Sequence, residues 1–212
     1  MTRLLASLLL FLLATAAYAR DFADWRDGDL VFHDSGGAQA EAIRVATRSP
    51  YTHMGIVRRT RSGPVVIEAA RTVGETRLAA FLARGKGGRY AVYRLRSPDP
   101  AGIGTALAEA KRYFGRPYDI FFRLEPSEIY CSELPHHAFN AAGIKLGRPE
   151  RFGALAVENP AVRQLFLARW RRHPDCRTTD EAGCWRLLQD QLFVTPASIA
   201  ADPQMERVFS NF

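Results

Sequence analysis

The chain has 212 residues, of which 47% are hydrophobic and 24% are charged. These fractions are those of an ordinary globular protein, and they exclude disordered, collagen-like and fibrous classes. The formal net charge of +7 predicts a basic surface. Because the sequence has no run of four Lys or Arg and no basic stripe interleaved with aromatic residues, we expect no nucleic-acid partner.

The N-terminus has the three parts of a secretory signal peptide. Arg3 supplies a positive charge, residues 4–14 form an uncharged apolar run, and Ala17-Tyr18-Ala19 is a small-x-small cleavage site. The apolar run is too short to cross a bilayer core of about 30 Å, so we expect no permanent membrane anchor. We predict that residues 1–19 are removed and that residues 20–212 act as one monomeric domain, periplasmic or secreted.

The rest of the chain mixes short strands with helices. Strands are predicted at residues 29–33, 51–58, 65–69 and 90–95, where apolar and β-branched residues gather between turn residues. Helices are predicted at residues 39–47, from Asp99-Pro100 to about Phe114, from Asn159-Pro160, and briefly from Thr195-Pro196. This order predicts an α+β fold with a small antiparallel sheet.

Export changes the interpretation of the three cysteines. Cys176 and Cys184 are separated by seven polar-rich residues and are able to form a disulfide in an oxidising compartment. The alternative is two unpaired cysteines on unrelated faces. Pairing them leaves Cys131 as a free thiol, which in an exported protein suggests a chemical task.

Two neighbouring strands carry a candidate catalytic pair. Residues 59–64 are typical of a hairpin connection, and a symmetric hairpin centred between Thr60 and Arg61 places His53 directly opposite Glu68. A carboxylate there fixes the imidazole tautomer and leaves the other ring nitrogen free to act. The alternative is an ordinary surface pair.

Cys131 is the candidate nucleophile. It comes just before the apolar-rich residues 132–142, which predict a helix, and a helix N-terminus lowers the pKa of a thiol. The first N–H groups of that helix also help to hold an oxyanion. The alternative is a buried structural cysteine. His136 and His137 point away from Cys131 on such a helix, and no CxxC or HExxH spacing suggests a metal site.

Four segments in a fixed order resemble a known superfamily. They are THMGIV at 52–57, VIEA at 66–69, PYD at 117–119 and YCSEL at 130–134. Together with VTPA at 194–197, they resemble the permuted papain-like branch of the NlpC/p60 superfamily, and most of all its YiiX/YaeF-like amidases. The resemblance runs from Gly28 to about Ile199, and His precedes Cys, the reverse of the papain order.

This resemblance implies a circularly permuted papain-like fold. It implies Cys131 as nucleophile, His53 as general base, Glu68 as the residue that orients His53, and Tyr118 and Tyr130 as pocket residues. One departure is Pro135, which follows YCSEL where relatives continue into a helix. Either the helix begins at Ser132 with Pro135 in its first turn, which leaves Cys131 just outside, or the helix is kinked.

We therefore expect an exported cysteine amidase or peptidase that forms an acyl-thioester and needs no metal or organic cofactor. The resemblance implies amide substrates in cell-wall peptides or N-acyl amines. One alternative is a lipid acyltransferase or phospholipase of the lecithin–retinol acyltransferase-like (LRAT-like) group, whose Asn-Cys motif Tyr130-Cys131 does not match. Another is a catalytically silent module that binds cell-wall peptides.

Overall fold

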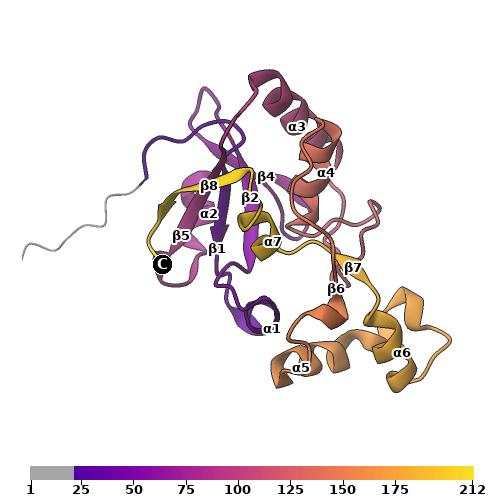
Figure 1. Cartoon of the computed structure of the whole chain (residues 1–212). Coiled ribbons are helices and arrows are strands. Elements are labelled where there is room, and N and C mark those ends of the chain that lie inside the picture. The colour runs from indigo at the N-terminus through magenta and orange to yellow at the C-terminus, as the bar shows by residue number, and fades with distance from the viewer. Residues whose placement is uncertain (1–21) are drawn as a thin grey trace, which may run out of the picture.

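A six-stranded antiparallel sheet forms the centre of the structure, a computed structural model that describes residues 22–212 (Figure 1). The strand order is β4-β3-β2-β1-β5-β8. These strands are β1 (Leu30–His33), β2 (His53–Arg58), β3 (Val65–Ala69), β4 (Val73–Arg77), β5 (Tyr90–Leu95) and β8 (Met205–Ser210). The predicted signal peptide and its cleavage site lie outside the described residues.

Helices cover both faces of this sheet. The helices are α1 (Gly37–Thr47), α2 (Leu78–Ala83), α3 (Pro100–Arg112), α4 (Glu133–Ala141), α5 (Pro160–Arg169), α6 (Glu181–Leu188) and α7 (Pro196–Ala200). Helices α3 and α4 lie side by side and pack on the face that carries Leu30 and Phe32, whereas α2 packs on the face that carries Val31. Every residue of β1 is buried because this strand lies between β2 and β5 and is covered on both faces of the sheet. The α+β fold class is confirmed.

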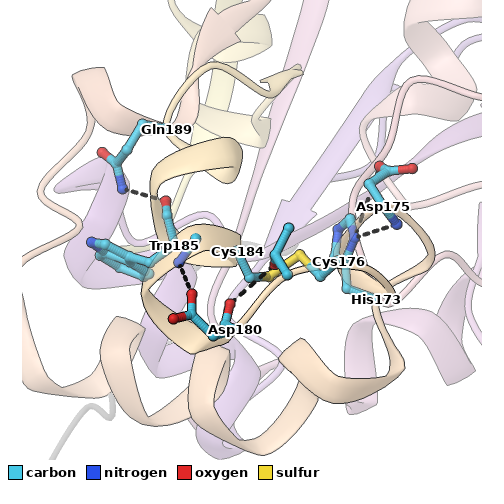
Figure 2. Close-up of a disulfide and its surroundings, with 9 residues drawn as sticks. His173, Asp175, Cys176, Asp180, Cys184, Trp185 and Gln189 are labelled. Atoms are coloured by element: carbon cyan, nitrogen blue, oxygen red, sulfur yellow. Dashed lines mark hydrogen bonds and ion pairs between the residues drawn. A yellow bond between two sulfur atoms is a disulfide. The ribbon is translucent and has the colours of Figure 1, made fainter.

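A second group of elements lies beside the sheet, at the lower right of Figure 1. It contains α5, α6 and the two-stranded sheet of β6 (Glu150–Arg151) and β7 (Leu192–Phe193), and α1 packs against α5. A disulfide joins Cys176 to Cys184 in this group, with a Cα–Cα distance of 5.1 Å (Figure 2). Both cysteines are buried against Phe166 and Leu188, and Cys131 stays free.

Three helices begin where the sequence predicts. Asp99 caps α3 by accepting hydrogen bonds from the backbone N–H groups of Ala101 and Gly102. Asn159 caps α5, and Thr195 forms a reciprocal capping box with Ser198 at α7. A proline occupies the first turn of each helix, where no backbone N–H is needed. None of the described helices is long and apolar enough to cross a membrane.

The predicted hairpin register is wrong by two residues. Strands β2 and β3 pair Ile56 with Ile67, so the same register places Gly55 opposite Glu68. The cause is the turn, in which the N–H of Gly63 donates to the carbonyl oxygen of Thr60 and Gly63 has a φ of 106°. This turn centres the hairpin between Arg61 and Ser62. A shift of two residues keeps each side chain on its face, so Glu68 still shares a face with His53.

Candidate active site

Cys131 lies just outside the N-terminus of helix α4. Ser132 is the N-cap residue, the helix begins at Glu133, and Pro135 is its third residue. The proline is therefore in the first turn, where its missing N–H breaks no helical hydrogen bond. Ser132 fixes this segment because its hydroxyl donates to the carbonyl oxygen of Val194 at 2.8 Å. The Cys131 side chain is 2% exposed, so access to the thiol depends on the cavities beside it.

His53 and Glu68 are in contact. The His53 Nε2 and a Glu68 carboxylate oxygen lie 2.6 Å apart, and Glu68 is 1% exposed. The other Glu68 oxygen accepts a hydrogen bond from Arg84, so both oxygens are held. Because Nε2 is occupied by Glu68, Nδ1 is the imidazole nitrogen that remains for the thiol.

The pKa values of these groups favour an ion pair. Burial opposes ionisation of the Cys131 thiol, but hydrogen bonding with His53 and its charge outweigh burial and lower the pKa of Cys131. Burial also opposes the charged form of His53 and so lowers its pKa, but the contacts with Cys131 and Glu68 outweigh burial and raise this pKa to about 9. Glu68 is buried too, but the hydrogen bond with His53 brings its pKa down to about 2. The contact with His53 therefore favours the thiolate form of Cys131, and the contacts with Cys131 and Glu68 favour the imidazolium form of His53.

Two further rings hold His53. His33 of β1 is the cross-strand partner of His53, and their ring centroids are 5.2 Å apart. Phe81 of α2 stacks on both, with centroids 4.5 Å from His33 and 5.6 Å from His53. Sequence reasoning missed His33, although its place at the end of a buried strand was a usable signal.

Tyr118 connects the thiol to the second group of elements. Its hydroxyl donates to the Cys131 Sγ at 4.0 Å and accepts from the Gln39 side-chain amide at 3.1 Å. The side-chain amide oxygen of Gln39 accepts in turn from the Arg169 guanidinium at 2.7 Å. Burial, together with Cys131, raises the pKa of Tyr118, so the phenol stays protonated and donates. Sequence reasoning missed Gln39 and Arg169 because helices α1 and α5 meet only in the folded chain.

An apolar cavity of about 120 Å³ opens beside Cys131. Tyr130, Cys131 and Ser132 are among its lining residues, and α1 and α5 contribute Ala42, Ala46, Val162, Leu165 and Phe166. The ring of Tyr130 thus contributes to the cavity, while its hydroxyl accepts from the backbone N–H of Val194 at 2.9 Å.

His136 and His137 lie away from this site. His136 bonds to the carbonyl oxygen of Leu146 at 2.6 Å, and His137 stacks on Tyr113 and bonds to Glu133 at 3.1 Å. Both histidines therefore have packing roles on α4.

The fold is similar to a solved structure described as metalloprotein yiiX from Escherichia coli O157:H7. The two share 28% sequence identity with a TM-score of 0.78, over 88% of this chain and 98% of that one. Within residues 22–212, no group of three or more His, Cys, Asp or Glu side chains is placed to hold a metal ion. The described residues thus do not form such a metal site.

The sequence is also similar to known proteins. It is 32% identical to the uncharacterized protein YiiX of Escherichia coli strain K12 over 145 residues, which cover 68% of this chain and 72% of YiiX. Residues 24–209 match the family described as permuted papain-like amidase enzyme, YaeF/YiiX, C92. With His53 before Cys131 in one site, the chain belongs to this permuted papain-like amidase family.

Proposed function

We propose that this protein is a cysteine amidase that hydrolyses N-acyl amines with an apolar acyl chain. The observation that carries the proposal is the apolar cavity that Cys131 lines, together with the contact between His53 and Glu68. Cys131 is the nucleophile, His53 the general acid and base, and Glu68 the residue that orients His53.

Acylation begins from the ion pair. The Cys131 thiolate attacks the carbonyl carbon of the amide, and the electron pair of the C=O bond moves to oxygen. In the first turn of α4, Pro135 has no N–H and Leu134 donates its N–H to the carbonyl oxygen of Tyr130, so Glu133 supplies the first-turn N–H for this oxyanion. The oxyanion then collapses, the C–N bond breaks, and the His53 imidazolium gives its proton to the leaving nitrogen. The products are a free amine and a thioester on Cys131.

Deacylation reverses these roles. Neutral His53 takes a proton from water while the water oxygen attacks the thioester carbonyl carbon. The C–S bond breaks, a carboxylic acid leaves, and the thiolate and imidazolium are restored. Glu68 stabilises the positive charge on His53 in both half-reactions.

The lining of the cavity supports N-acyl amines over cell-wall peptides, the two substrate classes that the family resemblance implies. Its walls are mainly Ala, Ile, Leu, Val and Phe side chains, which bind a hydrocarbon chain by removing it from water. Peptides of cell walls are polar and gain little from such a lining. The apolar walls also suit the lipid esters of the LRAT-like alternative, so esters belong in the test.

We further propose that the protein works outside the cytoplasm. The signal-like N-terminus supports this proposal, and so does the disulfide between Cys176 and Cys184, because disulfides persist in oxidising compartments.

A substrate panel with a cysteine-reactive probe tests the function. Purified protein is given N-lauroyl amides, cell-wall peptides and phospholipids, and released amine or acid is measured. We expect release from N-lauroyl amides, covalent labelling of Cys131, and loss of both in Cys131→Ala. Labelling without turnover of any substrate supports a binding module, and turnover of phospholipids alone supports the lipid acyl-hydrolase alternative.

A matched pair of α1 variants tests the cavity. Ala46 lines the cavity, whereas Ala38 is exposed on the same helix. We expect Ala46→Leu to lower kcat/KM for lauroyl amides while leaving acetyl amides unchanged, and Ala38→Leu to change neither. Equal loss on both substrates in Ala46→Leu would refute the acyl-binding role of the cavity.

A further inference from the structure

A second hollow lies beside His53. This cleft has a volume of about 740 Å³, and His33, His53, Arg71, Arg84 and Tyr118 are among its lining residues. Cys131 lines the apolar cavity but not the cleft, and His53 lines the cleft but not the cavity. Ile120 lines both, so the two hollows are neighbours.

This arrangement assigns one half of the substrate to each hollow. The acyl carbon bonds to Cys131, so the acyl chain extends into the cavity. The leaving nitrogen receives its proton from His53, so the amine half lies where His53 is accessible, which is the cleft.

The cleft is positively charged. Arg71 and Arg84 line it, and none of its lining residues is Asp or Glu. Arg71 is exposed, and its side chain makes no hydrogen bond or ion pair with the rest of residues 22–212. The Arg84 side chain is 44% exposed and uses one nitrogen to bond Glu68, which leaves further N–H donors for a ligand.

His33 adds an unpartnered polar group to the wall of the cleft. It is 1% exposed, and within the described chain neither of its ring nitrogens has a hydrogen-bond partner. Burial, with the charges of His53 and Arg84, lowers the pKa of His33 to about 3, so the ring is neutral and offers one N–H donor. Buried polar atoms are nearly always hydrogen-bonded, and an exception in a cleft indicates a place for a ligand atom.

We propose that the cleft binds an anionic group on the amine half of the substrate, with Arg71 and Arg84 as its cationic partners and His33 as a further donor. The substrates are then amides between an apolar acid and an amine that carries a carboxylate, such as N-acyl amino acids. This inference rests on the proposed function and names the substrate class of the same site.

Two probes that differ in charge test the proposal. N-lauroylglycine carries a carboxylate, and N-lauroylglycinamide is its neutral analogue. We expect the wild-type protein to favour N-lauroylglycine by about tenfold in kcat/KM, the size of one charge-assisted contact. Arg71→Gln removes most of this preference by slowing N-lauroylglycine alone. Arg61→Gln, in the exposed turn between β2 and β3, is the matched control and retains the preference.

Equal kcat/KM for the two probes in the wild-type protein, or equal loss on both in Arg71→Gln, would overturn the proposal. A binding measurement separates this failure from failure of the proposed function. We expect Cys131→Ala to bind N-lauroylglycine more tightly than N-lauroylglycinamide in calorimetry, and added salt to reduce the difference. Carboxylate-dependent binding without wild-type turnover refutes the amidase and supports the anion site. Turnover without charge preference supports the amidase and refutes the anion site. Absence of both binding and turnover refutes the amidase and the anion site together.

Discussion

Glu68 lies opposite Gly55 and reaches His53 diagonally across it. The β2–β3 register pairs Ile56 with Ile67, so the residue that faces Glu68 has no side chain. A Cβ atom on Gly55 would meet Val66 Cγ1 and would lie 2.8 Å from the carbonyl oxygen of Ile67 and 3.2 Å from Glu68 Cβ. The glycine therefore leaves room for the Glu68 side chain to extend along the strand to the imidazole.

The first prediction concerns this glycine. We expect Gly55→Ala to destabilise the fold by about 1–3 kcal/mol, as overpacking does in buried sites. It should also lower kcat, because Glu68 must move away from His53. Gly74 is the matched control, since it is the β4 partner of Glu68 and a Cβ there meets nothing within 4 Å. Urea unfolding and kinetics of both variants check this, and wild-type kcat in Gly55→Ala would contradict it.

The second prediction concerns the carboxylate itself. Glu68→Gln keeps the shape of the side chain but removes the charge that stabilises the imidazolium. We expect kcat to fall about ten- to a thousandfold, less than in His53→Ala, which removes the base. Steady-state kinetics on one amide substrate compare the variants. A wild-type rate in Glu68→Gln would end its assignment as the residue that orients His53.

The third prediction concerns pH. The pKa of Cys131 is lowered and that of His53 is raised to about 9, so the thiolate–imidazolium pair exists between these two pKa values. Lowering the pH protonates the thiolate only below the pKa of Cys131, and raising it removes the imidazolium proton above about 9. We expect alkylation of Cys131 by iodoacetamide to slow less from pH 8 to pH 6 than alkylation of an ordinary thiol, which slows about tenfold per unit, because the pKa of Cys131 is lowered.

Glutathione measured beside the protein is the control for that experiment. The pH dependence of hydrolysis tests the alkaline limit of the ion pair, because kcat/KM should fall as His53 loses its proton near pH 9. An alkylation profile that parallels glutathione would show that Cys131 is a neutral thiol.

The fourth prediction concerns the disulfide. Reduction, or replacement of Cys176 and Cys184 by serine, should lower the free energy of unfolding by about 2.5 kcal/mol from loop entropy. The bridge packs on Phe166 and Leu188, which also line the apolar cavity. Activity on lauroyl amides should therefore fall more than activity on acetyl amides. Peptide mass spectrometry without reduction establishes the bond, and a link from Cys131 to either partner would refute this pairing.

The elements with strong local signals were predictable from the sequence. The helix starts at Asp99, Asn159 and Thr195 depend on side chains that cap within three residues, so each signal is contained in a short segment. The central strand at β1 reads as a continuous apolar run because both its faces are buried. Strands β4 and β8 were missed because each of these edge strands buries only its first residue, so neither has a strong apolar pattern.

The site was only partly predictable because some of its contacts join elements that are distant in the sequence. His53 and Glu68 share a face in either register, so their contact follows even from a hairpin placed two residues off. The contacts of His33, Arg84 and Gln39 depend on where α1, α2 and the strands meet, which no local pattern contains. The choice between Pro135 in the first turn and a kinked helix also needed the structure, which starts α4 at Glu133.

The two halves of the apolar cavity belong to different parts of the chain. Cys131 and its helix pack on the central sheet, but the far wall comes from α5, from residues near the disulfide, and from β7. Substitutions in residues 152–193 therefore change the depth of the cavity without touching the strands that carry His53 and Glu68. Chain-length selectivity is open to engineering, or to divergence between related enzymes, while the reacting groups stay as they are.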